Sequence, residues 1–166
     1  KRIADFYPDL PPKVIEKFKE LKNYRKELVL PYRFHAGCNN NCAFCGLRRK
    51  KKFLQPNEVS KQMDEMIDKY KSKSFYFLHN NFLMDYKYAN YILDNQLNSG
   101  ELKWCDCASI KNMNEGFVRK MAKRGCIQLL VGLESGSQKI LKYVNKNSGV
   151  TSLNKYTRAF KACYRN

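Results

Sequence analysis

The chain has 166 residues, of which 43% are hydrophobic, and this is enough for one domain with a packed core. It carries 32 Lys and Arg against 15 Asp and Glu, a net charge of +17, and it has seven cysteines. No apolar run approaches the roughly 20 residues of a membrane-spanning helix, and residues 1–5 do not resemble the start of a signal peptide. An odd cysteine count with three cysteines close together does not indicate a disulfide framework, so we expect a cytoplasmic protein. Because no apolar segment is long enough to span a membrane, we expect no membrane partner.

The net charge of +17 leaves two interpretations open. It indicates either a polyanionic partner such as RNA or only a lysine-rich solvated surface. The second is favoured because the lysines are spread along the chain, so nucleic acid is kept as an alternative partner. The five consecutive cations at 48–52 are expected to form a solvated loop.

Residues 1–30 differ from the rest and are interpreted as an extended and helical lead-in, or linker. Pro8, Pro11 and Pro12 favour an extended or turn-like start, and residues 13–28 have the spacing of a short basic helix.

From residue 28 onward, strand-like and helix-like segments alternate. Strands are predicted at 29–35, 74–78, 102–108 and 126–133. Helices are predicted at 57–70, from an Asp85 cap to about 97, from an Asn114 cap to Gly125, after a Ser137 cap, and at 151–164. This alternation predicts parallel strands with right-handed crossovers, and no glycine-rich nucleotide fingerprint is present. We therefore expect an α/β fold in which residues 31–166 form a partial (β/α) TIM-like barrel of four strand–helix units.

A full eight-fold barrel needs about 250 residues, and the outer strands of four units alone would lack neighbours. We therefore expect these residues to be the N-terminal half of a barrel within a longer chain.

Cys38, Cys42 and Cys45 form a C-x3-C-x2-C pattern directly after the first predicted strand. A structural zinc site and a fully ligated four-iron cluster each use four protein ligands. Three thiolates hold three corners of a 4Fe-4S cluster and leave one iron open, so the spacing indicates reactive chemistry. A zinc site completed by His35 or His79 is an alternative.

Polar residues also follow the other three predicted strands. These groups are 79–81, 107–111 and 132–137. Because functional residues of parallel barrels lie at the carboxyl ends of the strands, we expect all of them at one edge of the sheet. Taken alone, Asn80 and Asn81 could be turn formers, and Glu134 could cap the following helix.

With Phe44 before the last cysteine, the cysteine motif resembles that of the radical S-adenosylmethionine (SAM) superfamily. The motifs after the second and fourth strands resemble the branch that often carries an upstream cobalamin-binding domain. The resemblance covers roughly residues 30–165 and implies a 4Fe-4S cluster on the three cysteines, with SAM bound to the open iron. It further implies reductive cleavage of SAM to methionine and a 5′-deoxyadenosyl radical, which abstracts hydrogen from a substrate.

The resemblance also implies roles for other residues. Phe44 would lie near the adenine, and Asn80 and Asn81 would contact the SAM amino group. Glu134, with Ser135 beside it, would meet the ribose or the amino-acid part, since a carboxylate can accept two hydroxyls or pair with an ammonium. The second motif departs from the family because His79, Asn80 and Asn81 replace its usual acidic residues.

The leading hypothesis is a radical SAM enzyme, or a fragment of one, that acts on an unidentified substrate. An electron donor such as flavodoxin or ferredoxin is the expected partner, and use of cobalamin through an upstream domain is left open. The alternatives are an RNA-modifying radical SAM enzyme, such as a tRNA methylthiotransferase-like protein, and a non-catalytic metal-binding module. The other cysteines are expected to pack in the core, with an auxiliary cluster as the alternative; they are Cys105, Cys107, Cys126 and Cys163.

Overall fold

The computed structural model describes residues 28–38, 40–47, 50–146 and 154–165. The predicted lead-in helix and residues 48–49 of the cationic run lie outside these ranges. Within them, no helix combines the length and the apolar character needed to cross a membrane.

Four parallel strands form the main sheet in the order β1-β4-β5-β6. They are β1 (Val29–Tyr32), β4 (Ser74–Phe77), β5 (Lys103–Ala108) and β6 (Cys126–Val131). Each strand pairs in parallel with the strand of the next strand–helix unit. The structure therefore confirms the predicted α/β fold of four successive parallel units.

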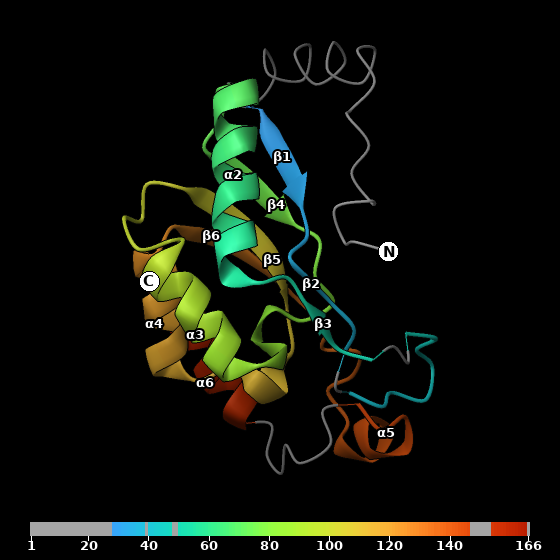
Figure 1. The fold of residues 1–166 in the computed structure, drawn as a ribbon. Helices are drawn as coiled ribbons and strands as arrows, with labels where there is room; N and C mark the ends of the chain where they lie inside the picture. The colour runs from blue at the N-terminus through green and yellow to red at the C-terminus, as the bar shows by residue number, and fades with distance from the viewer. Residues whose placement is uncertain (1–27, 39, 48–49, 147–153, 166) are drawn as a thin grey trace.

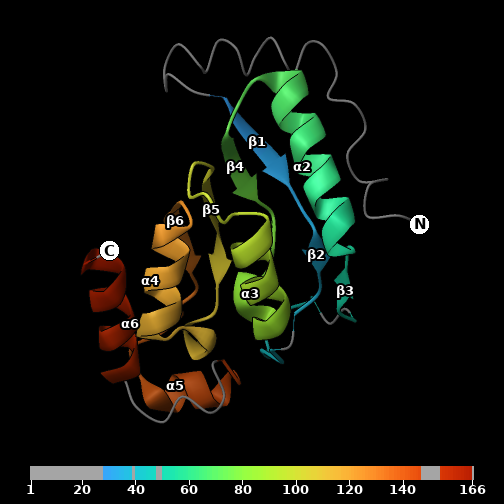
Figure 2. The ribbon, with the colours of Figure 1, turned by 60° about the vertical axis from the view of Figure 1, so that its left-hand side comes forward.

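The helices follow the strands at the predicted positions. They are α2 (Pro56–Tyr70), α3 (Tyr86–Asn95), α4 (Glu115–Lys123), α5 (Gln138–Tyr143) and α6 (Asn154–Arg165). The side chains of Asp85, Asn114 and Ser137 each accept a backbone N–H of the helix that follows, which confirms the three predicted caps. Figures 1 and 2 show α2, α3 and α4 along one face of the sheet, and α5 beyond the end toward which the strands point.

The hydrophobic core lies between the sheet and these helices. Strand residues that point toward the helices are almost fully buried, among them Tyr32, Phe77 and Trp104. Because side chains alternate along a strand, Cys105 and Cys107 point to the other face, where they are only partly buried. The expectation that these two cysteines pack in the core is therefore wrong. In a closed barrel that face would be the interior.

A short antiparallel ribbon at the end of β1 was not predicted. The expected strand 29–35 stops at Tyr32, and β2 (His35–Ala36) leaves the main sheet to pair with β3 (Lys52–Phe53). The ribbon closes the base of the loop that carries the three cysteines, and it places Lys52 in a strand rather than in the predicted loop. Strands of two residues carry no periodic pattern, so the sequence could not indicate them.

Trp104→Ala tests the assignment of the two sheet faces. The indole is fully buried, and its N–H donates to the Arg124 carbonyl at 2.8 Å. We expect the free energy of unfolding to fall by about 3–5 kcal/mol, because the substitution leaves a cavity. Cys105→Ala, at the neighbouring position on the other face, is the matched control and should cost less than about 1 kcal/mol. Equal losses of unfolding free energy in the two variants, measured by urea denaturation, would contradict the assignment of the two faces.

Candidate functional site

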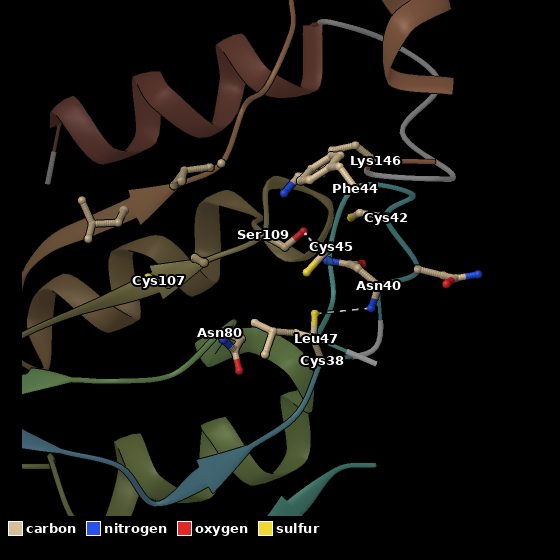
Figure 3. A pocket seen from close by; sticks show the side chains of 15 residues that line it. Cys38, Asn40, Cys42, Phe44, Cys45, Leu47, Asn80, Cys107, Ser109 and Lys146 are labelled. Carbon is tan, nitrogen blue, oxygen red and sulfur yellow. Dashed lines mark hydrogen bonds between the residues drawn. The ribbon is translucent and has the colours of Figure 1, made fainter. Parts of the chain in front are cut away.

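A cavity of about 390 Å³ lies at the carboxyl end of the sheet, and Cys38, Cys42 and Cys45 all line it. Figure 3 shows the three sulfur-bearing side chains on the loop that borders the cavity. The other walls come from the ends of β4, β5 and β6, through residues such as Asn80, Ser109 and Gly132, and from Lys146 after α5. The strand ends thus meet at one site, as the parallel arrangement predicts.

The cysteine loop is fixed to the segment that follows α5. The backbone N–H of Ala43 donates to the Val144 carbonyl at 2.8 Å, and the side-chain amide of Asn145 donates to the Asn41 carbonyl at 2.7 Å. These bonds join parts of the chain about a hundred residues apart. The positions of the three thiols therefore depend on the chain beyond β6 as well as on β1.

A hydrogen bond and a positive charge act on two of the thiols. The backbone N–H of Asn40 donates to the Cys38 sulfur at 3.4 Å. Burial raises the pKa of the Cys42 thiol, and the positive charge of Lys146 partly offsets this effect. Thiolates are the metal-binding form of cysteine, so metal binding at this loop would release protons.

The donors that the cysteine loop offers are thiols, which both zinc sites and iron–sulfur clusters use. In the part of the chain that the structure describes, no group of three or more His, Cys, Asp or Glu is arranged to hold a single metal ion. Zinc needs such a group, with ligands at about 2.0–2.3 Å. Three thiols line one cavity, and thiolates are also the ligands of iron–sulfur clusters.

His79 is not available as a fourth zinc ligand, because both of its ring nitrogens are hydrogen-bonded. Its Nε2 accepts the backbone N–H of Phe34 at 3.2 Å, and its Nδ1 lies 2.5 Å from Asp106 Oδ2. Since Nε2 accepts, the neutral ring carries its proton on Nδ1 and donates it to the carboxylate. Burial lowers the pKa of His79, which agrees with the neutral ring.

Asp106 is a structural residue that the sequence did not reveal. Its Oδ1 accepts the backbone N–H of His79 at 3.3 Å and that of Cys107 at 2.6 Å. Burial raises the pKa of the Asp106 carboxyl, and these two N–H donors oppose the rise. The one available signal was a charged residue at a core-facing position of a predicted strand, which requires buried partners.

The structure separates the two asparagines after β4. Asn80 is exposed and lines the cavity. Asn81 is fully buried, its Oδ1 accepts the Ser109 N–H at 3.0 Å, and its Nδ2 donates to Asn112 Oδ1 at 3.2 Å. The sequence-based role of Asn81 as a ligand contact is therefore replaced by a structural one, because its amide already links the ends of β4 and β5.

Glu134 and Lys146 form an ion pair beside the cavity; Lys146 lines the cavity, whereas Glu134 is not among its lining residues. Glu134 adopts a left-handed φ of 62°, which is uncommon for a residue other than glycine. Its carboxylate lies 3.1 Å from the Lys146 amino group, which in turn lies 5.8 Å from the centroid of the Phe44 ring. A Cβ at Gly132 would come within 2.6 Å of Glu134 Oε1, so a larger residue there would push the Glu134 side chain away.

This arrangement settles two points about the motif after β6. Ser137 is the residue that caps α5, so the alternative role of Glu134 as the cap is wrong. Ser135 accepts the Ser137 N–H at 3.0 Å and supports the turn into the helix. Lys146 was missed because it lies twelve residues beyond Glu134, where no sequence pattern connects the two.

Comparison with known proteins identifies related sequences and folds. The family model for the radical SAM superfamily matches residues 32–166. An uncharacterized methyltransferase of Pyrococcus horikoshii is 28% identical over 120 residues, which cover 69% of this chain and 26% of that protein.

Two solved proteins have a similar fold. The radical SAM methyltransferase TsrM from Kitasatospora setae, solved with cobalamin and a [4Fe-4S] cluster bound, has a TM-score of 0.72 at 15% identity, over 88% of this chain and 28% of that one. TsrM with tryptophan substrate and a SAM analogue gives the same TM-score. HydG, a maturase of the [FeFe]-hydrogenase, has a TM-score of 0.59 at 14% identity, over 93% of this chain and 38% of that one. This chain thus spans about a quarter to two fifths of the length of these proteins.

His35→Phe tests the burial of the ring beside His79. The two rings stack with centroids 3.7 Å apart, and among the described residues neither nitrogen of His35 has a hydrogen-bond partner. Burial lowers the pKa of His35 to about 2, so below about pH 6.5 the unfolded chain takes up a proton that the folded protein excludes. Wild-type stability therefore falls as the pH falls through this range.

The phenylalanine variant lacks this proton uptake. As the pH is lowered below about 6, the free energy of unfolding of the variant should rise relative to that of wild type, by up to about 1.4 kcal/mol for each pH unit. Urea denaturation at a series of pH values measures this difference. Parallel pH profiles for the two proteins would contradict the burial of an uncharged His35.

Proposed function

Because the chain belongs to the radical SAM superfamily, we propose that Cys38, Cys42 and Cys45 bind a 4Fe-4S cluster and that the cavity they line binds SAM. The observation that carries the proposal is the convergence of three thiols and Lys146, which pairs with Glu134, around one cavity. When bound, the cluster and SAM together would supply a carbon-centred radical by one-electron cleavage of the sulfonium.

The loop residues would stabilise the charged thiolates. The Asn40 N–H is placed to donate to the Cys38 sulfur, and the Lys146 charge opposes the burial of Cys42. Both interactions reduce the cost of holding several negative charges in a partly buried site.

The remaining cavity residues would orient SAM by its polar groups and its base. The Glu134 carboxylate can accept ribose hydroxyls or an ammonium, and Lys146 can pair with a ligand carboxylate once it leaves Glu134. The Asn80 amide oxygen can accept a hydrogen bond from an ammonium. The Phe44 ring is 57% exposed beside the cavity and offers a flat apolar surface to the adenine.

Methyl transfer is the reaction that we propose within this class. The Pyrococcus horikoshii relative is named a methyltransferase, and TsrM is a methyltransferase that holds cobalamin together with its cluster. A cobalamin site for this protein would have to come from outside the described residues. Supplying the full-length protein with SAM and cobalamin and following transfer of a labelled methyl group would test this reaction.

The cluster ligands are tested by changing Cys38, Cys42 and Cys45 to alanine together. After anaerobic reconstitution with iron and sulfide, the triple variant should keep less than about a tenth of the wild-type iron, because all proposed thiolate ligands are gone. The matched control changes Cys105, Cys126 and Cys163, which do not line the cavity. Cluster assembly is measured by iron analysis and visible absorbance. If both triple variants assembled the same cluster, the assignment of the three ligands would be wrong.

Glu134→Gln tests the SAM contact. The amide keeps the shape of the side chain but loses the charge, so SAM affinity of the cluster-loaded protein should fall about 10- to 100-fold in calorimetric titration. Glu115→Gln removes the charge of an exposed glutamate that pairs with Arg119 on α4, and it serves as the control. An unchanged affinity in the Glu134 variant would remove this residue from the site.

A further inference from the structure

The net positive charge is concentrated in two segments of the chain. Residues 28–57 contain six Lys and Arg and no Asp or Glu, and residues 135–166 contain seven Lys and Arg and again no acid. Residues 58–134, which lie between them, carry a net charge of only +1. The lysines are spread along the chain, but these two segments together account for +13 of the net charge of +17.

The fold brings the cysteine loop and the part of the second segment around α5 together beside the cavity, whereas α6, with four cations of that segment, packs against α4. The bonds from Ala43 to Val144 and from Asn145 to Asn41 join the loop directly to the part around α5. Five exposed lysines, which we call the cationic rim, lie on these segments: Lys50, Lys51, Lys52, Lys139 and Lys142. Glu134, a carboxylate just before the second of these segments, is already paired with Lys146.

Helix α5 adds exposed apolar surface to the cationic rim. Tyr143 is 88% exposed and Ile140 is 51% exposed, on the same short helix as two of the lysines. Figure 1 shows α5 beside the end of the cysteine loop. An exposed aromatic side chain is a common anchor of protein-binding surfaces, and the rim of such surfaces is polar.

We propose that the cationic rim and the exposed face of α5 form the docking surface for an acidic one-electron donor protein. This inference rests on the proposed function, because a donor is needed only if the three cysteines hold a cluster. One electron would leave the donor and enter the cluster, and no atom or proton would be exchanged. Lysines next to the cysteine loop would attract an acidic donor to the part of the molecule where the electron is needed.

RNA is the other polyanion that such a surface attracts. Surfaces that bind single-stranded RNA combine cations with successive aromatic rings on which the bases stack. Helix α5 offers a single aromatic ring, Tyr143, and Phe44 lies at the cavity instead. The composition of the surface therefore favours a protein partner.

The test uses the full-length, cluster-loaded protein and two charge-matched variants. In the rim variant, the five lysines of the cationic rim are changed to glutamine. In the control variant, five exposed lysines at the opposite end of the sheet are changed to glutamine; they are Lys69, Lys71, Lys73, Lys103 and Lys123. Stopped-flow absorbance follows cluster reduction by reduced flavodoxin, an acidic protein donor, and by reduced methyl viologen, a small cation.

We expect the rim variant to react with flavodoxin about tenfold more slowly than wild type at low salt, and the control variant to change less than about twofold. High salt should shrink the difference, because it screens the exposed charges. With methyl viologen the rim variant should react at least as fast as wild type, which would show that its cluster is intact.

Equal rates of the rim variant and wild type with flavodoxin would overturn the docking surface. If, in addition, a single-stranded RNA oligonucleotide bound wild type and not the rim variant, the surface would be an RNA site. If no cluster assembled in any of the three proteins, the proposed function itself would fail, and the docking surface with it.

Discussion

Three strands are held together at their carboxyl ends by hydrogen bonds around one buried carboxylate. Asp106, on β5, accepts a ring N–H and a backbone N–H from His79, which follows β4. The same ring accepts the N–H of Phe34, between β1 and β2. Removing one partner would leave a buried polar group without its hydrogen bond, at a cost of about 1–3 kcal/mol or more, so the three strand ends are expected to form as one unit.

This hydrogen-bonded group also determines where the cysteine loop begins. His35 stacks on His79 and starts the short β2–β3 ribbon that closes the base of the loop. The far side of the loop is held by hydrogen bonds to the segment after α5. The three thiols are thus positioned from both sides by parts of the fold that carry no metal ligand of their own.

The sheet is covered by helices on one face, whereas parallel sheets usually have both faces covered. On the other face Cys107 and Leu130 are partly or largely exposed, and both line the cavity. A second cavity of about 460 Å³ runs along β6 between α4 and α6. In a closed barrel this open face is the interior and β6 has a further neighbour, and the proteins with the same fold are considerably longer than this chain.

The sequence by itself determined the helices and strands and predicted the chemistry of the cysteine loop. Hydrophobic periodicity and the caps Asp85, Asn114 and Ser137 depend on residues within one or two turns of each other, so they could be read without tertiary contacts. Successive parallel units then predict the order of the strands, and the cysteine spacing predicts a cluster with an open iron.

Only the tertiary structure decided which polar residues line the cavity. Asn80 and Asn81 are adjacent in the sequence, yet one lines the cavity and the other is buried between strands. Lys146 reaches Glu134 and Phe44 because the chain after α5 returns to the cysteine loop, through a bond between residues 104 positions apart. Such contacts leave no periodic signal in the sequence, because they depend on how whole elements pack and not on neighbouring residues.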